Sequence, residues 1–266
     1  MSIVLAPFSI FAIVYLLFLS NPCTVYAKDH NISAAKWTSA GATWYGAPTG
    51  FGSDGGACGY TTSVQSKPFS SMIAAGNPTL FRSGKGCGEC YQVMCNAKPE
   101  CSKKSIEVVI TDLCPPGGQC TAQKVHFDLS GTAFGALAKK GKENELRNVG
   151  ILPVLYKRVE CDYPGYNLIF KIDAGSNPYY LAVLIEYERG DGDLSAVSLK
   201  DGSAKSKEWK SMNHSWGAIW KLDAGTKLTG PLSIKITTMK GKKLKVKNVI
   251  PVNWGPGQTY RAKVNF

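Results

Sequence analysis

Hydrophobic and polar positions alternate in many short runs along the first half of the chain. A period of two is typical of strands that bury one face, and it predicts strands over residues 41–45, 90–94, 106–112, 125–127 and 150–160. Helical spacing is limited to residues 72–75, before Gly76, and residues 133–138, with Gly141 as a stop. Many short strands with little helix predict a small closed barrel.

The second half keeps this period, and turn residues punctuate it. It predicts strands over residues 168–172, 180–187, 196–199, 218–221, 232–238, 244–250 and 261–266. Such a series of short strands within roughly 100 residues is typical of a β-sandwich. The composition changes near residues 162–165, where the cysteines stop. We therefore expect an all-β protein with a barrel domain over residues 28–163 and a sandwich domain over residues 164–266, joined by a linker short enough for them to pack together.

The first 27 residues have the features of a secretory signal peptide. Residues 3–19 are almost wholly apolar, and Val25-Tyr26-Ala27 offers a cleavage site. A membrane-spanning signal anchor is the alternative, but Pro7 and the short apolar run fit it poorly. The sequence therefore predicts a secreted, extracellular protein that is peripheral to membranes at most.

The cysteines predict a disulfide framework. Nine are present, and Cys23 would leave with the signal peptide. The remaining eight precede residue 162, and an even number in a secreted chain predicts four disulfides without fixing their connectivity. Cys87 and Cys90 have the spacing of a zinc or redox pair. Because the chain has only three histidines and an oxidising compartment favours bridges, we expect no metal and no cofactor.

Charge is distributed unevenly, and two thirds of the net charge of +12 lies beyond residue 169. Lysines alternate with other residues there, at Lys205, Lys207 and Lys210 and again over residues 240–247. One interpretation is a solvated strand face that resists aggregation. The other is attraction to an acidic matrix such as a uronic-acid polysaccharide. We expect no nucleic-acid binding from a secreted chain without a recognised motif.

Two sequons predict N-glycosylation. Asn31 lies in the polar N-terminal extension, and Asn213 precedes an aromatic cluster. The Asn77 sequon is excluded because proline follows the asparagine. Glycans at Asn31 and Asn213 would fit a secreted chain.

Two aspartates are the candidates for chemistry. Asp128 follows the run 125–127, and Asp112 ends the run 106–112. Two such carboxylates in a small β domain can point into one cleft, where they could do acid–base chemistry. The simpler interpretations are a helix N-cap for Asp128 and a turn residue for Asp112. His126 either orients Asp128 or only packs.

An aromatic strand, Thr43-Trp44-Tyr45, leads into a glycine-rich loop. Successive side chains face opposite sides of a strand, so either Trp44 or the pair of Thr43 and Tyr45 faces a cleft. No Lys-Ser or Lys-Thr follows the glycines, which argues against a phosphate-binding loop. We expect the glycines to permit tight turns or close approach of a ligand to the backbone.

These motifs, in their order and spacing, resemble the plant expansins, and among them the β-expansin branch that includes grass-pollen group-1 allergens. The resemblance covers essentially the whole chain after the signal peptide. It rests on Thr43-Trp44-Tyr45-Gly46, Gly55-Gly56-Ala57-Cys58-Gly59-Tyr60, Cys87-Gly88-Glu89-Cys90-Tyr91, Ile110-Thr111-Asp112, His126-Phe127-Asp128-Leu129-Ser130-Gly131, Tyr156-Lys157-Arg158-Val159 and Ser215-Trp216-Gly217-Ala218-Ile219-Trp220.

The resemblance implies a six-stranded double-psi β-barrel followed by an immunoglobulin-like carbohydrate-binding domain. Members of the family make wall polysaccharides slip without cutting them, and the β branch is associated with walls rich in glucuronoarabinoxylan. We therefore expect a monomer that binds cellulose, glucuronoarabinoxylan or another acidic matrix glycan in the plant cell wall. The implied disulfides are Cys58–Cys87, Cys90–Cys161, Cys95–Cys101 and, thereby, Cys114–Cys120.

The same barrel resembles that of family-45 endoglucanases, which use an acid and a base. Their acid resembles Asp128, but their base lies where this sequence reads Gly46-Ala47-Pro48-Thr49, and the next acidic residue is Asp54. Loss of a general base typically costs about 10²–10⁴-fold in rate. We therefore predict a non-hydrolytic protein that holds sugars through the hydrogen bonds of Asp128, Asp112, Thr43 and Tyr45.

Two alternatives stay open. One is an endo-acting, inverting glycoside hydrolase with Asp128 as acid and Asp112 or Asp54 as base, for which the carboxyls would be roughly 6.5–9.5 Å apart. The other is a pure carbohydrate-binding or defence protein with no effect on wall mechanics.

The resemblance also implies a flat aromatic platform of Tyr180 and Trp216 in the second domain, which Trp44 would extend. Tryptophans in a sandwich are otherwise core residues, as we expect of Trp209 and Trp220. Trp216 and Trp220 are four residues apart and would share a face of a regular strand. A bulge or turn at Gly217 must intervene if one is exposed and the other buried.

Overall fold

The computed structural model describes residues 36–203 and 208–266, which belong to one compact unit. The predicted signal peptide, Cys23, Asn31, Lys205 and Lys207 lie outside the described residues. Within the described residues, no helix has the length and hydropathy needed to cross a membrane.

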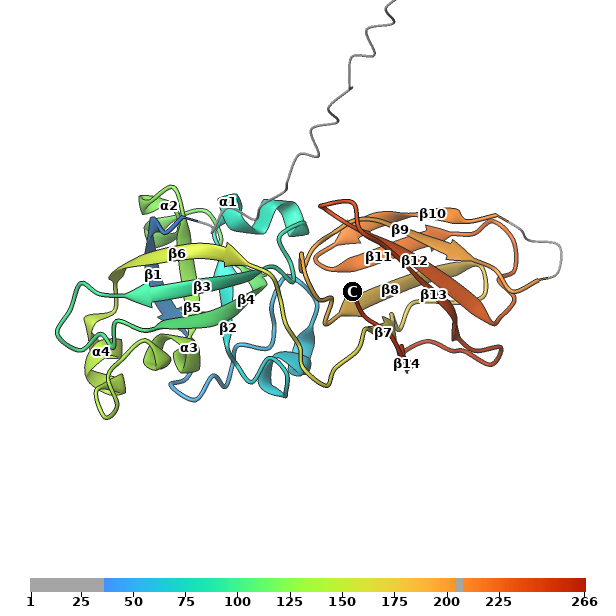
Figure 1. Ribbon diagram of the computed structural model, residues 1–266. Helices are drawn as coiled ribbons and strands as arrows, with labels where there is room; N and C mark the ends of the chain where they lie inside the picture. The colour runs from blue at the N-terminus through green and yellow to red at the C-terminus, as the bar shows by residue number, and fades with distance from the viewer. Residues whose placement is uncertain (1–35, 204–207) are drawn as a thin grey trace, which may run out of the picture. The chain divides into compact units, whose positions relative to one another are not determined.

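Six strands close into a barrel in the order β1-β5-β2-β4-β3-β6 (Figure 1). They are β1 (Thr38–Tyr45), β2 (Ile73–Gly76), β3 (Cys90–Cys95), β4 (Ser105–Leu113), β5 (His126–Ser130) and β6 (Leu152–Val159). The pairs β1–β5 and β2–β4 are parallel, and the others are antiparallel. Every second residue points inward, so Ala42, Phe127 and Leu129 lie in the barrel core.

Short helices connect the barrel strands. They are η1 (Thr61–Gln65), α1 (Pro78–Phe81), η2 (Arg82–Gly84), α2 (Gly118–Ala122), α3 (Gly131–Ala136) and α4 (Glu143–Val149). Helix α3 corresponds to the predicted helix 133–138 but begins earlier, because the Ser130 hydroxyl caps it by accepting from the Ala133 N–H at 3.0 Å. Asp128 is therefore not its N-cap.

The predicted helix over residues 72–75 is wrong. Residues Ile73–Gly76 form strand β2, whose four residues are buried between β4 and β5. A short apolar run has no period long enough to distinguish a buried strand from a helix, and pairing on both sides decides the outcome.

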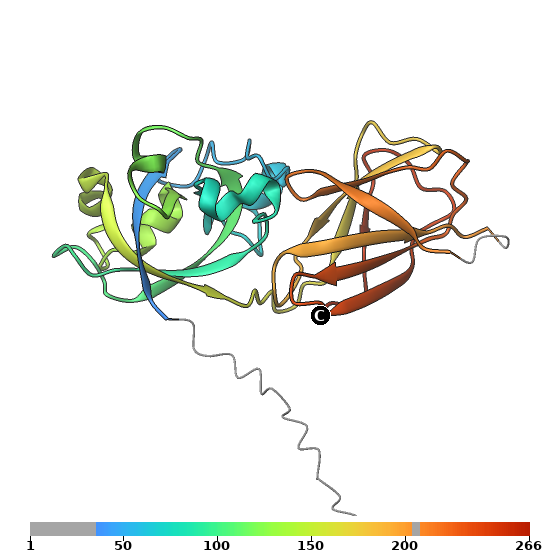
Figure 2. The ribbon, with the colours of Figure 1, turned by 90° about the horizontal axis from the view of Figure 1, so that it is seen from above.

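Eight strands form a second sheet in the order β13-β12-β9-β10-β11-β8-β7-β14 (labelled in Figure 1 and seen from above, in yellow to red, in Figure 2). They are β7 (Ile169–Ile172), β8 (Tyr180–Glu186), β9 (Leu194–Lys200), β10 (Lys210–Trp216), β11 (Ile219–Asp223), β12 (Leu232–Thr238), β13 (Lys243–Ile250) and β14 (Thr259–Arg261). Apolar residues from both ends of this order, such as Phe170, Val183 and Ile236, share one core, which gives a sandwich-like arrangement.

Two details of this sheet differ from the predicted strands. Strand β10 was not predicted, because only Met212 is buried in its otherwise polar sequence. The last strand covers Thr259–Arg261 rather than residues 261–266. The predicted domain boundary after residue 163 falls between β6 and β7, and it stays a prediction.

Four disulfides join the cysteines of the described chain. They are Cys58–Cys87, Cys90–Cys161, Cys95–Cys101 and Cys114–Cys120, the pairs expected above. Cys58–Cys87 fastens the glycine-rich loop after β1 to the segment before β3. Cys90–Cys161 joins the start of β3 to the segment that leads out of the barrel.

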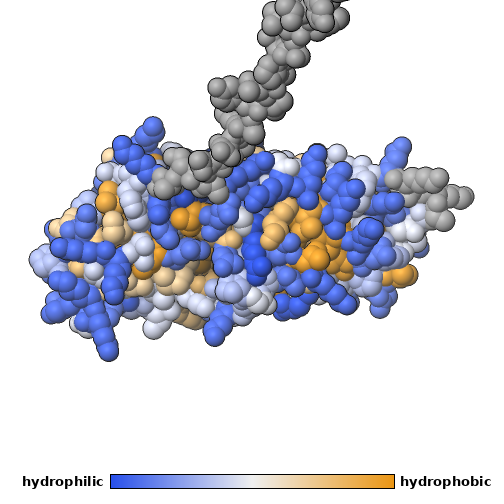
Figure 3. Space-filling view, viewed as in Figure 1, coloured by the Kyte–Doolittle hydropathy of each residue, from blue (hydrophilic) through white to orange (hydrophobic). Residues whose placement is uncertain are grey.

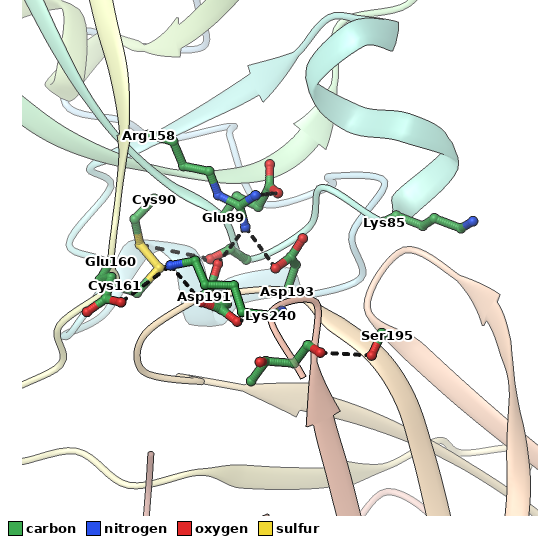
Figure 4. Close-up of polar contacts among 12 residues, drawn as sticks. Lys85, Glu89, Cys90, Arg158, Glu160, Cys161, Asp191, Asp193, Ser195 and Lys240 are labelled. Atoms are coloured by element: carbon green, nitrogen blue, oxygen red, sulfur yellow. Dashed lines mark hydrogen bonds and ion pairs between the residues drawn. A yellow bond between two sulfur atoms is a disulfide. The ribbon is translucent and has the colours of Figure 1, made fainter. Parts of the chain in front are cut away.

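A polar network joins the barrel to the second sheet (Figure 4). Arg158 of β6 contacts the buried carboxylates of Glu89 and Asp193 at 2.8 Å each. Lys240 contacts Asp191 at 3.0 Å and Glu160 at 3.4 Å. Glu89 and Glu160 belong to the barrel side and Asp191 and Asp193 to the segment before β9, so the network ties the two sheets together.

Candidate functional site

The first part of the candidate site is set by the parallel pairing of β1 and β5. This pairing places Thr43 directly opposite Asp128 and Gly41 opposite His126. The Thr43 hydroxyl donates to Asp128 Oδ1 at 2.7 Å and lies 2.8 Å from His126 Nε2. An ionised carboxylate only accepts, so the second contact requires the His126 Nε2–H to donate to Thr43. His126 thus reaches Asp128 through Thr43.

The register extends this arrangement into a row across four strands. Ala75 of β2 is opposite Asp128 on one side and opposite Asp112 of β4 on the other. Residues directly opposite each other share a face of the sheet, so Thr43, Asp128, Ala75 and Asp112 form one row. Two strand spacings, roughly 9.5 Å, separate the Cα atoms of the two aspartates. Ala75, between them, has a small side chain that is itself only 3% exposed.

A β-bulge brings Asp112 to this face. Ala74 pairs with Ile110, but the next residue, Ala75, pairs with Asp112, so Thr111 is the extra residue of β4. Ile110 lies in the barrel core, and strict alternation would have turned Asp112 inward with it. The bulge instead aligns Asp112 with Asp128.

Asp112 also holds the glycine-rich loop. Its Oδ1 accepts from the backbone N–H of Ala57 at 2.6 Å and of Leu113 at 2.7 Å. A Cβ at Gly56 would lie 2.5 Å from the Thr111 carbonyl oxygen, so only glycine allows the loop to approach this closely. One oxygen of Asp112 therefore bonds backbone N–H groups, as expected of a turn residue. The same carboxylate also belongs to the row.

Burial shifts the pKa values of Asp128, His126 and Tyr45 in the direction of their uncharged forms. Burial raises the pKa of Asp128, and the charge of Asp112 adds to the rise, while the Thr43 hydrogen bond opposes it. Burial lowers the pKa of His126, which favours the neutral ring. Burial, then the charges of Asp112 and Asp128, raises the pKa of Tyr45 well above its ordinary value. Tyr45 therefore remains a phenol that can donate a hydrogen bond.

Two hydroxyls beside the row lack partners within the described chain. The oxygens of Tyr45 and Thr111 are buried, and no hydrogen bond of ordinary geometry reaches either one, although Thr111 lies near enough to lower the pKa of Tyr45 slightly. Buried hydroxyls are normally paired. These two are therefore candidates for contact with a ligand, and Thr111 was missed from the sequence because it resembles an ordinary strand threonine.

The structure does not bring Trp44 to this group. Its indole N–H donates to the Arg147 carbonyl at 3.0 Å, and its ring packs partly against the barrel core beside Phe134. Thr43 and Tyr45, one residue to either side, lie on the other face of β1. The sequence left open whether Trp44 or the pair of Thr43 and Tyr45 shares a face with Asp128, and in the structure it is Thr43 and Tyr45.

The second part of the candidate site is aromatic. Trp216 is 51% exposed at the end of β10, and Trp220 is 7% exposed in the sandwich core. A register shift between His214 and Trp216 and a left-handed Gly217 (φ 52°) separate them, as the sequence required. Trp209 is only half-buried and lies outside the core clusters, so its assignment as a core residue is wrong.

Tyr180 and Trp216 share the outer face of the second sheet. Trp216 is opposite Ile219, Ile219 is opposite Leu184, and Tyr180 lies four residues before Leu184 along β8. Four residues of strand span about 13 Å. The two aromatic side chains therefore lie on one face and are separated along it. Tyr180 is half-buried and Trp216 is exposed.

The segment Gly56–Gly59 lies between the two parts. Ala57 donates to Asp112, the Cys58 carbonyl accepts from the Ala218 N–H at 3.0 Å, and a Cβ at Gly59 would lie 3.0 Å from the Trp216 ring. One short segment thus contacts Asp112 at one end and Trp216 at the other. Gly59, one of the loop glycines expected to permit tight turns or close approach, is required here by its positive φ of 84° and by the Trp216 ring.

The remaining predicted positions are peripheral to both parts. Asp54 is half-buried in the glycine-rich loop, outside the row. Asn213 is exposed on β10, and its glycosylation stays a prediction.

Two family models match the chain. The Expansin C-terminal domain matches residues 168–251, and DPBB_1, described as lytic transglycolase, matches residues 73–156. Among solved structures, apo Clavibacter michiganensis expansin covers 86% of this chain and 98% of its own, with a TM-score of 0.65 at 21% identity. A mutant of that expansin in complex with cellohexaose gives a TM-score of 0.64 at 20% identity over the same shares. These structural likenesses concern the fold.

Sequence relatives are much more similar. Expansin-B11 of Oryza sativa subsp. japonica is 53% identical over 86% of this chain and 78% of its own. Expansin-B4 of Arabidopsis thaliana is 48% identical over 91% of this chain and 92% of its own. With such identity over most of both chains, this protein belongs to the expansin family.

Proposed function

We propose that this chain is a secreted plant protein that loosens the cell wall by gripping polysaccharide without cutting it. The observation that carries the proposal is the row of Thr43, Asp128, Ala75 and Asp112, which offers hydrogen-bonding groups on one face. Carboxylates accept strongly from sugar hydroxyls. Tyr45 and Thr111 add hydroxyls without partners among the described residues.

The aromatic part would hold the same polysaccharide over a longer stretch. Sugar CH groups stack on flat rings, and Trp216 and Tyr180 present rings on one outer face. Gly56–Gly59 joins this face to Asp112, so one glycan chain can contact both parts. The expansin solved with cellohexaose supports a glucan as one ligand. Cellulose and glucuronoarabinoxylan are the proposed partners, and the protein would act as a monomer.

A hydrolytic function is the second candidate, because two observations favour it. Asp128 has the raised pKa that a general acid needs, and Asp112 lies on the same face two strands away. Against it, Asp112 Oδ1 is occupied by two backbone N–H groups, and no acidic residue follows β1 before Asp54. A water activated by Asp112 would have to use its other oxygen.

Creep of heat-inactivated cell walls under constant load tests the proposal. We expect the purified protein to induce extension without releasing reducing sugar, and the variants Asp128→Asn and Trp216→Ala to lose most of that extension. Tyr179→Ala, which removes another exposed aromatic beside Tyr180, is the matched control for Trp216. Release of reducing sugar at an enzyme-like rate, abolished by Asp128→Asn, would establish hydrolysis instead. Binding without any extension would leave a pure binding protein.

A further inference from the structure

We propose that an N-linked glycan on Asn213 covers the aromatic part of the candidate site and controls its access to polysaccharide. Asn213 begins the sequon Asn213-His214-Ser215 and belongs to neither part of the site, but it borders the aromatic one. The inference rests on the proposed function, because it concerns the regulation of binding at Trp216 and Tyr180. It adds two forms of the same chain, one with the aromatic face open and one with it covered.

Strand register places Asn213 on the same face of the sheet as Tyr180. Asn213 of β10 is opposite Lys221 of β11, which is opposite Ala182 of β8. Tyr180 lies two residues before Ala182 along β8, and alternate residues of a strand share a face. Two strand spacings and two residues of strand put the Cα atoms of Asn213 and Tyr180 roughly 12 Å apart.

A β-bulge turns Trp216 to this face as well. Asn213 and Trp216 are three residues apart, and regular alternation would place them on opposite faces. The register shift after His214 makes the next residue an extra one, so Trp216 is opposite Ile219. Ile219 is two residues from the β11 partner of Asn213 and shares its face. The row of Asn213 therefore lies between the rows of the two aromatic rings.

The surroundings of Asn213 leave room for a modification. Its side chain is exposed, and so is that of Lys221 directly opposite. The next residue, His214, faces the other way: its ring packs edge-on against Trp220, and its Nε2–H donates to the Gly217 carbonyl at 2.7 Å. Asn213 can therefore carry a glycan without disturbing the sandwich core.

The modification is a group transfer to the side-chain amide. An oligosaccharide linked to a lipid diphosphate, the donor in the secretory pathway, supplies the sugar. The bond between its anomeric carbon and the diphosphate breaks, and a bond from that carbon to Asn213 Nδ2 forms. The displaced lipid diphosphate takes the amide proton. The product is a bulky, hydrophilic group on the outer face of β10.

A glycan at this position would compete with polysaccharide for the rings. Hydrophilic residues cover much of the surface seen in Figure 3, and Trp216, at 51% exposure, is one of few large apolar residues exposed within the described chain. The sugars of the glycan have the same CH groups as those of a polysaccharide, so they can stack on the indole in its place. Because the glycan is attached to the protein, it is always present at the face that it covers.

The experiment compares the full chain secreted by plant cells with forms that lack the glycan. Asn213→Gln and Ser215→Ala each remove the sequon. Enzymatic removal of glycans from the folded protein gives the same comparison without an effect on folding. Asn31→Gln, which removes the other predicted sequon, is the control for the enzyme treatment.

A matched control moves the glycan elsewhere. In Asn213→Gln/Lys103→Asn the new sequon uses Ser105, two residues after Lys103. Lys103 is exposed, and it precedes β4, at the end of that strand far from Asp112. Its left-handed φ of 59° suits asparagine.

Peptide mass spectrometry of the secreted chain should show a glycan on Asn213. Forms without that glycan should bind a neutral cello-oligosaccharide roughly fivefold more tightly, as expected when one aromatic contact becomes accessible. The variant with the moved glycan should match Asn213→Gln, and Asn31→Gln should match the unchanged protein. An unmodified Asn213, or equal affinity with and without its glycan, would overturn the proposal.

A measurement without polysaccharide keeps this proposal distinct from the proposed function. Oxidation of tryptophans by a small water-soluble reagent, followed by peptide mass spectrometry, reports access to Trp216, with half-buried Trp37 as internal reference. Removal of the Asn213 glycan should increase oxidation of Trp216 relative to Trp37. If it does and no form binds the oligosaccharide, the proposed function fails while the cover stands. If binding depends on Trp216 but neither readout responds to the glycan, only the cover fails.

Discussion

At the scale of single residues, Thr43 is the hydrogen-bonding centre of the row. One hydroxyl group contacts both His126 and Asp128, so the position of the carboxylate depends on a side chain from another strand. His126 itself is 1% exposed, and a Cβ at Gly41 would lie 2.7 Å from its Nδ1. The His126 ring is therefore held in place, and the Thr43 hydroxyl links it to Asp128 through hydrogen bonds.

Replacement of Thr43 by valine tests this arrangement. Thr43→Val keeps the shape but leaves the His126 Nε2–H without its acceptor, which should reduce the free energy of unfolding by about 1–2 kcal/mol. Because the Thr43 hydrogen bond lowers the pKa of Asp128, its loss should raise that pKa further, as a carboxyl titration by NMR would show. Thr38→Val, on the exposed start of β1, is the control. An unchanged Asp128 pKa would contradict this role.

Single residues also show how much of the candidate site the sequence could predict. The sequence placed Thr43, Tyr45, Asp112 and Asp128 in one candidate site, and the row contains three of them with Tyr45 beside it. The sequence did not show which way Trp44 faces, because alternation tells which residues share a face of a strand but not which face points to the core. The Arg147 carbonyl, over a hundred residues away along the chain, accepts the indole N–H and fixes that direction.

At the scale of elements, irregularities decide which residues meet. Asp112 reaches the row only because Thr111 is an extra residue in β4, and no glycine or proline in residues 105–113 indicates a bulge there. The turn at Gly217 was predictable, because two tryptophans with opposite environments required it. A bulge can therefore be predicted where two residues of known, opposite burial would share a face of a regular strand. It cannot be predicted at a residue such as Thr111, whose polar side chain suits either face.

The segment between β8 and β9 contains a titratable group that links pH to stability. Both carboxylate oxygens of Glu188 are buried and without hydrogen-bond partners in the described chain. Burial, then the charges of Asp191 and Asp193, raises the pKa of Glu188 to about 9. The folded state thus holds this proton more tightly than the unfolded state, in which the pKa is about 4.3. Its contribution to stability is complete below pH 4.3 and is lost as pH rises toward 9.

Glu188→Gln should remove this pH dependence, because the amide cannot ionise. Relative to the unchanged protein, the variant should gain up to about 1.4 kcal/mol per pH unit between pH 5 and 8. Denaturant unfolding at pH 4, 6 and 8 measures the difference. Glu145→Gln, on the exposed face of α4, is the control and should show little change. A difference independent of pH would rule out titration of Glu188 as the cause.

At the scale of the whole molecule, the arrangement of barrel and sheet was the most predictable level. Alternation predicted most strands and a closed barrel, and the expansin motifs added its six-stranded form and the disulfide pairs. The contacts that join the two sheets were not predicted, because Glu89, Arg158 and Asp193 are far apart in sequence and resemble ordinary surface charges. Only the folded chain shows that both carboxylates are buried.

Replacement of Arg158 tests the ion pairs that join the two sheets. Arg158→Leu leaves Glu89 and Asp193 buried with Arg82 as their remaining cation, and such a loss typically costs about 3–5 kcal/mol. Because the Arg158 side chain is partly exposed, we expect about 3 kcal/mol in denaturant unfolding. Lys142→Leu breaks an exposed pair with Glu145 and should change the free energy of unfolding little, because solvent screens such a pair. Equal costs for the two variants would show that the joint is no stronger than a surface pair.

The apolar cluster shared by the barrel and the second sheet limits how such proteins can be recombined. Tyr60, Phe69 and Ile73 of the barrel belong to one buried cluster with Leu184 and Ile219 of the sheet. A barrel taken from a distant relative would meet the sheet with side chains of other shapes at this cluster, and Trp216 would lose the close fit against Gly59. The two halves therefore fit each other as a matched pair, and we expect a chimera to need both sides of the cluster from the same parent.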